Sequence, residues 1–316
     1  MEAEWVDYLR KTLPPPPPSV LLALGDDAAV LAPSAFGTVV TVDLLTEGVD
    51  FLLDEHDPSL IGRKALAVNL SDLAAMGAMP TAVVVAVALP RSGPYPPAVL
   101  AKLLYEGMQP LLDRYSLSLI GGDTNTWDGG LVVSVTALGM TTKNGVLTRA
   151  GARAGDRILI TGPLGGSRLE RQFTFEPRIR EILLLHEHYE CHAAIDISDS
   201  FSLDLYRLCR ESSLGAEVVF SRIPIHPDAF RWAKTCGETC GETLSAVEHA
   251  LSDGEDFELI LAVSPDSATQ ILREQPLFAA FDCLLYDVGS FLEEPGLWMM
   301  DEDGNRHVLH PRGYTH

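Results

Sequence analysis

The chain has 316 residues, of which 47% are hydrophobic and 21% are charged, a globular composition with enough length for two domains. Its formal net charge of −21 argues against nucleic acid or an anionic membrane as a partner. The first eleven residues are too charged for a signal peptide, and the longest apolar run, 82–89, is too short to span a bilayer. We therefore expect a cytoplasmic protein that binds neither nucleic acid nor membrane.

The N-terminal half is predicted to alternate strands and helices. Its central helix begins near Asp57 and ends at Gly77, where glycine permits a left-handed stop and Pro80 prevents continuation. The other expected elements are strands at 20–24 and 39–45, a strand at 81–89, a helix at 97–115, and strands at 117–120 and 131–138. The order β-β-α-β-α-β-β predicts an α+β domain with helices covering one face of its sheet.

The chain changes character near Thr148–Gly155, so we expect two domains, 1–147 and 148–316. The glycine-rich turn Gly162–Gly166 is not a Walker loop, because no Gly-Lys-Ser/Thr follows it. The expected helices of this half are 178–188, 203–212, 228–235, 244–251 and 268–274. Its expected strands are 157–161, 193–197, 217–220, 223–225, 257–263, 284–291 and 297–300.

Two short features are interpreted without a chemical role. The proline run Pro14–Pro18 favours a stiff polyproline spacer over a ligand for a proline-binding domain, because it has no basic flank. The pair Cys236 and Cys240 lacks two further zinc ligands at a suitable spacing, so we expect reduced thiols.

Carboxylates recur in or beside short turns and at the ends of predicted elements. One such aspartate is usually part of the turn itself. Asp43 interrupts a β-branched strand, and Asp72 lies among alanines on the central helix, where an unpaired carboxylate must meet water, a base or a metal. The set comprises Asp26, Asp27, Asp43, Asp72, Asp123, Asp196, Asp199 and Glu255. So many oxygen ligands predict several Mg²⁺ ions around a polyphosphate, and therefore phosphoryl transfer.

Seven segments, in order over nearly the whole chain, resemble the thiamine-monophosphate kinase family of the aminoimidazole-ribonucleotide-synthetase-like superfamily. The most specific of them is KALAVNLSDLAAMGAMP (64–80). The others are GDDAAVL (25–31), Asp43 followed by EGVDF (47–51), LIGGDT (119–124), LTRAGARAGD (147–156), AIDISD (194–199) and GEDFEL (254–259).

This resemblance implies a two-domain α/β protein. The N-terminal domains of a homodimer would form a shared β-barrel, the C-terminal domain would be an α/β sandwich, and ATP would lie between the two domains. The family transfers the γ-phosphate of ATP directly to thiamine monophosphate with the help of Mg²⁺, giving thiamine diphosphate. The resemblance implies no phosphoenzyme and no nucleophilic catalytic side chain.

The resemblance also assigns residues to roles. Metal positions are Asp27, Thr41, Val42, Asp43, Asp72, Asp123, Asp196 and Asp199, with Val42 acting only through its carbonyl. ATP positions are Tyr105, Gly122, Asp123, Arg149 and Ser198. Acceptor-side positions are Asp50, Glu255 and Tyr314, where a carboxylate and an aromatic ring would suit a cationic thiazolium. Arg149 has an alternative interpretation as an inter-domain ion pair, and Tyr105 as a core residue.

Three positions depart from the family pattern. Asp50 stands where the family usually has histidine, and Ser200 stands where glycine would permit freer backbone. Asp253 replaces the first glycine of a GGED motif and adds a charge to an expected turn. These departures lie in the C-terminal half and near the expected acceptor side, whereas the expected metal and ATP motifs are nearly intact.

Other hypotheses remain beside the kinase. A selenophosphate-synthetase-like enzyme would need a reactive cysteine near the N-terminus, but the first cysteine is Cys191. A carbamoyl-dehydratase-like enzyme would need a C-terminal cysteine, but the chain ends at His316. A nucleotide-binding protein without turnover is the third hypothesis, suggested by the altered C-terminal motifs.

Overall fold

The computed structural model describes residues 9, 11–22, 30–33, 36–239 and 244–314. Contacts between Cα atoms divide the chain into two units. Unit 1 comprises Met1–Leu73 and Ala78–Lys143, and unit 2 comprises Ala74–Gly77 and Asn144–His316. The main change of unit therefore falls between Lys143 and Asn144, and we describe each unit by itself.

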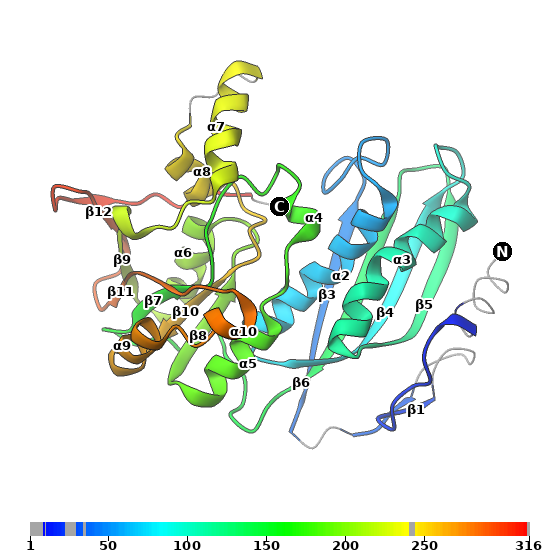
Figure 1. Cartoon of the computed structure of the whole chain (residues 1–316), viewed down its shortest axis with the longest axis horizontal. Coiled ribbons are helices and arrows are strands. Elements are labelled where there is room, and N and C mark those ends of the chain that lie inside the picture. Colours follow the sequence, from blue (N-terminus) through cyan, green and yellow to red (C-terminus); the bar gives the residue numbers. More distant parts are fainter. Residues whose placement is uncertain (1–8, 10, 23–29, 34–35, 240–243, 315–316) are drawn as a thin grey trace. The chain divides into compact units, whose positions relative to one another are not determined.

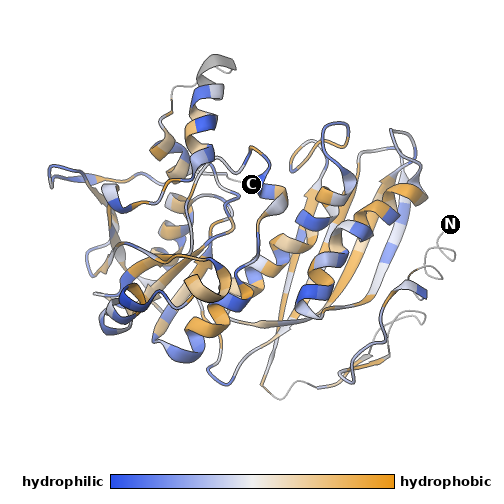
Figure 2. Cartoon of the chain, viewed as in Figure 1, coloured by the Kyte–Doolittle hydropathy of each residue, from blue (hydrophilic) through white to orange (hydrophobic). Residues whose placement is uncertain are grey.

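Unit 1 is built on a four-stranded sheet with the order β3-β6-β4-β5. Its strands are β3 (Thr38–Thr46), β6 (Val132–Met140), β4 (Met79–Pro90) and β5 (Ser118–Trp127). β6 pairs antiparallel with both β3 and β4, whereas β4 and β5 are parallel and are joined by a helical crossover. The expected strands and helices of this unit are found in order, with a short additional strand at Val30–Leu31. Strands β4 and β6 are largely hydrophobic, whereas β5 is more polar (Figure 2).

Helices α2 (Pro58–Ala75) and α3 (Pro97–Tyr115) lie side by side on one face of this sheet (Figure 1). The two helices are in backbone contact, because a Cβ atom on Gly62 would lie only 2.0 Å from the carbonyl oxygen of Leu104. As expected, α2 stops before Gly77, which has a φ of 61°. The small residues of α2 therefore allow close packing of α3 and the sheet.

The described residues cover the opposite face of the sheet only in part. The short strands β1 (Val20–Leu22) and β2 (Val30–Leu31) pair with each other, and Val20 packs against Ala82 and Ile120. Along β3, Val40, Val42 and Leu44 are 60%, 61% and 60% exposed. Alternation of side chains along the strand thus places three apolar residues on an open face and Thr41, Asp43 and Leu45 on the face next to the helices.

The expected strand at 117–120 is longer in the structure. β5 continues through Gly121–Asp123 to Trp127, in parallel register with β4. The prediction that Asp123 lies in a turn after the strand is therefore wrong. Pairing with β4 prevails over the turn tendency of Gly-Gly-Asp, and Gly122 fits because a Cβ atom there would lie 2.1 Å from the Val85 carbonyl oxygen.

Unit 2 contains a seven-stranded sheet in which only β12 and β9 are parallel among the paired strands. In sheet order, the strands are β13 (Arg306–Val308), β12 (Gly296–Met300), β9 (Gly215–Val219), β11 (Tyr286–Leu292), β7 (Arg157–Ile160), β10 (Leu259–Val263) and β8 (Cys191–Asp196). Phe201, Leu205 and Leu208 of α6 (Phe201–Ser212) pack on Ile160 and Ile260 in its core.

Unit 2 has further helices, of which α7 (Pro227–Thr239) projects away from the sheet (Figure 1). The others are α4 (Arg171–Thr174), α5 (Ile179–His188), the 3₁₀ turn η1 (Phe220–Arg222), α8 (Ala246–Ser252), α9 (Pro265–Glu274) and α10 (Phe278–Phe281). The short extended piece expected at 223–225 is confirmed as extended backbone with one β-bridge, between Ile225 and Leu164. Helices α4 and α10 and strand β13 were not expected. No helix in the described part of the chain is long and apolar enough to cross a membrane.

Candidate functional site

A first group of polar residues lies in unit 1, where β3 meets α2. Thr41 Oγ1 donates a hydrogen bond to Asp72 Oδ2 at 2.5 Å, and the Asp43 amide donates to Asn69 Oδ1 at 3.1 Å. Asn69 is fully buried, and its Nδ2 donates to the Ala65 carbonyl at 3.0 Å, which fixes the side chain on α2. Three of the expected metal positions, Thr41, Asp43 and Asp72, are therefore brought together.

The electrostatics of this group favour a cation. Burial is the largest cause that raises the pKa of Asp43 to about 7, and the charges of Asp72 and Asp50 act in the same direction. A divalent cation bound between these groups would relieve their repulsion. Carboxylate and hydroxyl oxygens are hard ligands of the kind that Mg²⁺ binds, so the residues present fit that ion.

The raised pKa of Asp43 predicts a pH dependence of stability in the metal-free protein. In the folded state Asp43 keeps its proton up to about pH 7, whereas the ordinary pKa of an aspartate is 3.8. Between these two pH values the folded state therefore binds more protons than the unfolded state. Stability should therefore fall as the pH rises through this window, by at most about 1.4 kcal/mol per pH unit. Urea unfolding of the wild type and Asp43→Asn, compared across the window, tests this. A difference in the free energy of unfolding between the wild type and Asp43→Asn that stays constant with pH would contradict this prediction.

Asp50, expected on the acceptor side, lies in the turn after β3. Its Oδ2 accepts a hydrogen bond from the Thr46 amide at 2.7 Å. Its carbonyl oxygen accepts from Lys64 Nζ at 3.0 Å, and Lys64 is fully buried on α2. Since Asp50 also contributes to the raised pKa of Asp43, its charge belongs to the same acidic group.

Asp123 lies on the other face of the sheet from Asp43. The register aligns Asp123 with Ala86, Ser134 and Leu44, whose side chains point to the open face. β3 and β5 are also opposite edges of the sheet, three strand spacings or about 14 Å apart. Asp123 is therefore not part of the Asp43–Asp72 group within unit 1.

A second group of expected residues lies in unit 2, at the loop between β8 and α6. Asp204 is buried, and its Oδ2 accepts hydrogen bonds from the amides of Ser198, Asp199 and Ser200 at 3.1, 3.0 and 3.1 Å. Burial is the largest cause that raises the pKa of Asp204. Arg207 Nη1 pairs with both Asp199 and Asp204, so the loop is fixed by a buried carboxylate and a guanidinium.

The C-terminal segment closes on this loop. The Tyr314 amide donates to the Asp199 carbonyl at 3.1 Å, and the Arg312 carbonyl accepts from Ser200 Oγ at 2.5 Å and Ser202 Oγ at 2.9 Å. The Glu255 amide donates to the Ser198 carbonyl at 2.7 Å. Ser198, Asp199, Glu255 and Tyr314 are therefore neighbours, although they come from three separate parts of the sequence.

Two departures from the family pattern are accommodated without disruption. Ser200 has a φ of 160°, an extended conformation open to any residue, so the expected disadvantage of serine there is wrong. Its hydroxyl caps α6 by accepting from the Leu203 amide at 3.1 Å. Asp253 accepts from the Gly166 amide at 3.2 Å and lies 2.8 Å from His249 Nδ1, so its charge has partners.

The remaining expected residues are Asp196, Arg149, Tyr105 and Asp27. Asp196 ends β8 and is 3% exposed. Arg149 is exposed, and its alternative interpretation as an inter-domain ion pair stays a prediction. Tyr105 on α3 is 3% exposed, and Asp27 lies outside the described residues.

In the described residues, no three His, Cys, Asp or Glu side chains form a ready metal site. Mg²⁺ is usually held by one or two carboxylates together with water and substrate phosphate. A pair such as Asp43 and Asp72 therefore supplies as many protein carboxylates as one Mg²⁺ ion needs. The expectation of several Mg²⁺ ions around a polyphosphate stays a prediction.

Our sequence interpretation missed Asn69, Lys64, Asp204 and Arg207. Asn69 is three residues before Asp72 on the same helix, and that spacing was a usable signal for a shared site. Asp204 is four residues after Ser200 in the first helical turn, where a carboxylate can accept from free amides. The buried state of Lys64 had no signal, because periodicity alone does not distinguish a buried lysine from an exposed one.

Comparison with known proteins gives consistent matches. The profile described as AIR synthase related protein, N-terminal domain, matches residues 25–141. A thiamine-monophosphate kinase of Rhodopirellula baltica is 38% identical over 327 residues, which cover 100% of this chain and 97% of that protein. The similarity therefore extends over both units.

Solved structures give the same result. The crystal structure of thiamine-monophosphate kinase from Stenotrophomonas maltophilia K279a matches with a TM-score of 0.76 and 31% identity, covering 96% of this chain and 95% of that one. A structure of AaThiL complexed with AMPPCP and TMP matches with a TM-score of 0.69 and 26% identity, covering 100% and 96%.

Proposed function

Because this chain belongs to the thiamine-monophosphate kinase family, we propose that it transfers the γ-phosphate of ATP to thiamine monophosphate and forms thiamine diphosphate. The observation that carries this proposal is the convergence of Asp43 and Asp72 from two elements, with a raised pKa at Asp43. The relative complexed with AMPPCP and TMP supports the same pair of substrates.

In this proposal the chain positions its substrates and supplies no nucleophile. Bound Mg²⁺ would neutralise charge on the phosphates during direct in-line transfer. Asp43, Asp72 and the Thr41 hydroxyl would hold one ion, with Asp27 and the Val42 carbonyl as further ligands. Asp123, on the other face of the sheet, would serve a separate ion or the nucleotide beside Gly122.

The group in unit 2 would bind the remaining parts of the substrates. Asp196 and Asp199 would contribute metal ligands, while Ser198 and Arg149 would contact the nucleotide. Arg149 has an exposed guanidinium suited to phosphate. Glu255 and Tyr314 would face the thiazolium of the acceptor, whose positive charge suits a carboxylate and an aromatic ring. Tyr105 is a less favourable nucleotide contact, because it is buried.

We also propose that the chain is a cytoplasmic homodimer in which two copies of the four-stranded sheet form a shared β-barrel. The open face carries Val40, Val42 and Leu44, each about three-fifths exposed. In the described sheet, β3 and β5 are the edge strands, so each pairs with another strand on one side only. Association of two such sheets would cover both features at once.

Removal of magnesium tests the proposed reaction. The full chain with ATP and thiamine monophosphate should form thiamine diphosphate, and a chelator should lower the rate by at least about 10²-fold, because charge neutralisation dominates phosphoryl transfer. Chromatographic measurement of thiamine diphosphate, with excess Mg²⁺ added back as the control, gives the result. ATP binding by folded protein without any thiamine diphosphate would instead indicate a nucleotide-binding protein.

A further inference from the structure

The segment that carries Glu255 has an unusual backbone. Gly254, Glu255 and Phe257 have φ values of 75°, 55° and 51°, in the left-handed region that side-chain-bearing residues rarely adopt. Such a conformation persists only where the surroundings hold it in place, and it is frequent at binding sites. The contacts that hold this segment therefore also fix the backbone conformation of Glu255.

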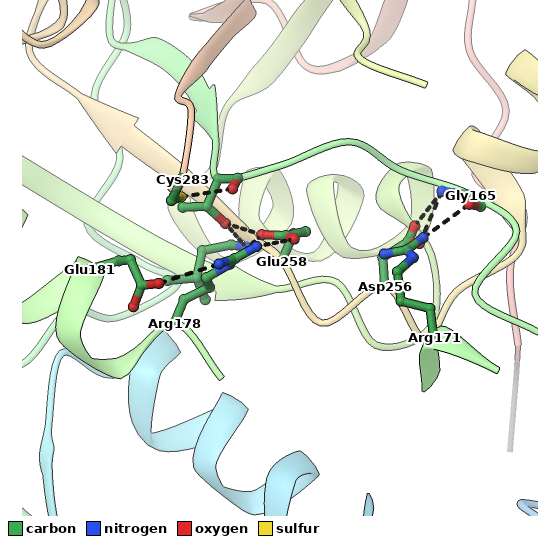
Figure 3. Close-up of polar contacts among 9 residues, drawn as sticks. Gly165, Arg171, Arg178, Glu181, Asp256, Glu258 and Cys283 are labelled. Atoms are coloured by element: carbon green, nitrogen blue, oxygen red, sulfur yellow. Dashed lines mark hydrogen bonds and ion pairs between the residues drawn. The ribbon is translucent and has the colours of Figure 1, made fainter. Parts of the chain in front are cut away.

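The first contact is a buried ion pair. Asp256 is 1% exposed, and both its carboxylate oxygens accept from the Gly165 amide, at 2.9 and 3.0 Å. Arg171 Nη2 donates to Asp256 Oδ1 at 2.7 Å and to the Gly165 carbonyl at 2.9 Å (Figure 3). One guanidinium thus links the glycine-rich turn to the residue that follows Glu255.

The second contact comes from the residue that follows the short helix of Arg171. Phe175, directly after α4, stacks on Phe257 with ring centroids 4.1 Å apart. Before Glu255, Ser167 Oγ donates to the Gly254 carbonyl at 2.6 Å. The segment 165–175 therefore contacts residues on both sides of Glu255, which explains the glycine-rich turn without any phosphate binding.

From this arrangement we propose that Arg171 is a positioning residue: through Asp256 and Gly165 it fixes the Glu255 segment and so determines affinity for thiamine monophosphate. The proposal rests on the proposed function, because Glu255 is assigned to the acceptor side there. A planar guanidinium can bond a carboxylate and a carbonyl simultaneously, which a methionine of similar length cannot do.

Arg171→Met should raise the KM for thiamine monophosphate at least about tenfold and change the KM for ATP less than about twofold. The KM of Arg171→Lys for thiamine monophosphate should lie between those of the wild type and Arg171→Met. Lysine keeps the positive charge but lacks the planar set of donors that a guanidinium provides. The matched control is Arg157→Met, which removes another Arg–Asp pair of unit 2, with Asp287 at 2.5 Å. Equal rises in both KM values, or a rise in the control as large as in Arg171→Met, would overturn the proposal.

Hydrogen exchange supplies a readout that needs no activity. The Glu255 and Phe257 amides donate to the Ser198 and Ile197 carbonyls, and they should exchange about tenfold faster in Arg171→Met than in the control. Unchanged exchange would overturn the positioning role. If the wild-type chain formed no thiamine diphosphate, the proposed function would fail, whereas exchange would still decide whether Arg171 fixes this segment.

Discussion

Replacing Asp72 with asparagine is expected to lower kcat/KM for thiamine diphosphate formation by about 10³-fold, or about 4 kcal/mol. Asp72 accepts from Thr41 at 2.5 Å and contributes to the raised pKa of Asp43, so it lies where a cation is needed. The amide oxygen of asparagine can still accept from Thr41, and the fold should survive. The lost charge removes a strong oxygen ligand, so the Mg²⁺ concentration for half-maximal rate should also rise.

The control for this prediction is Asp113→Asn, which makes the same chemical change on an exposed position of α3 in the same unit. Its kinetic constants should match the wild type. Steady-state rates over a Mg²⁺ titration, with circular dichroism of each variant, separate lost chemistry from lost folding. A well-folded Asp72→Asn variant with wild-type kcat/KM would remove this carboxylate from the proposed metal site.

The bounds of helices α2 and α3 in unit 1 were predicted closely from the sequence. Helix α3 spans 97–115, as its apolar spacing predicted, and Asp57 and Gly77 enclose α2. The glycine-rich stretch of unit 2 was less predictable. Its turn at Gly165 is fixed by Asp256, which is 91 residues away in sequence, so no local pattern could indicate the partner. Short elements such as α4 depend on such contacts more than on propensity.

In the candidate site too, features that depend on neighbouring residues could be predicted, and features that depend on distant contacts could not. The chemical character of Asp43 and Asp72 could be predicted, because a carboxylate in an apolar element needs a partner. The face on which Asp123 lies could not. Between Leu119 and Gly121, β5 has one extra residue relative to β4, and this bulge at Ile120 shifts the alternation. Simple alternation would have placed Asp123 on the same face as Leu119, and a one-residue shift reverses that.

Replacing Val40 with aspartate is expected to abolish the proposed dimer. Val40 is 60% exposed on the open face of the sheet, and its neighbours across β6 and β4 are Leu138 and Ala82. Buried in a barrel between two copies, an unpaired carboxylate would cost several kcal/mol, which corresponds to a dissociation constant raised by at least about 10³-fold. Light scattering should give about twice 34.3 kDa for the wild type and one such mass for the variant.

The control is Val99→Asp, the same substitution at a valine that is 46% exposed on α3, away from the open face. This variant should remain dimeric, because aspartate in the first turn of a helix is favourable and no proposed interface is touched. Position 40 was chosen over position 42 because Val42 is a proposed metal position. A monomeric wild type, or a dimer that survives Val40→Asp with unchanged affinity, would show that the open face is not the surface through which two copies associate.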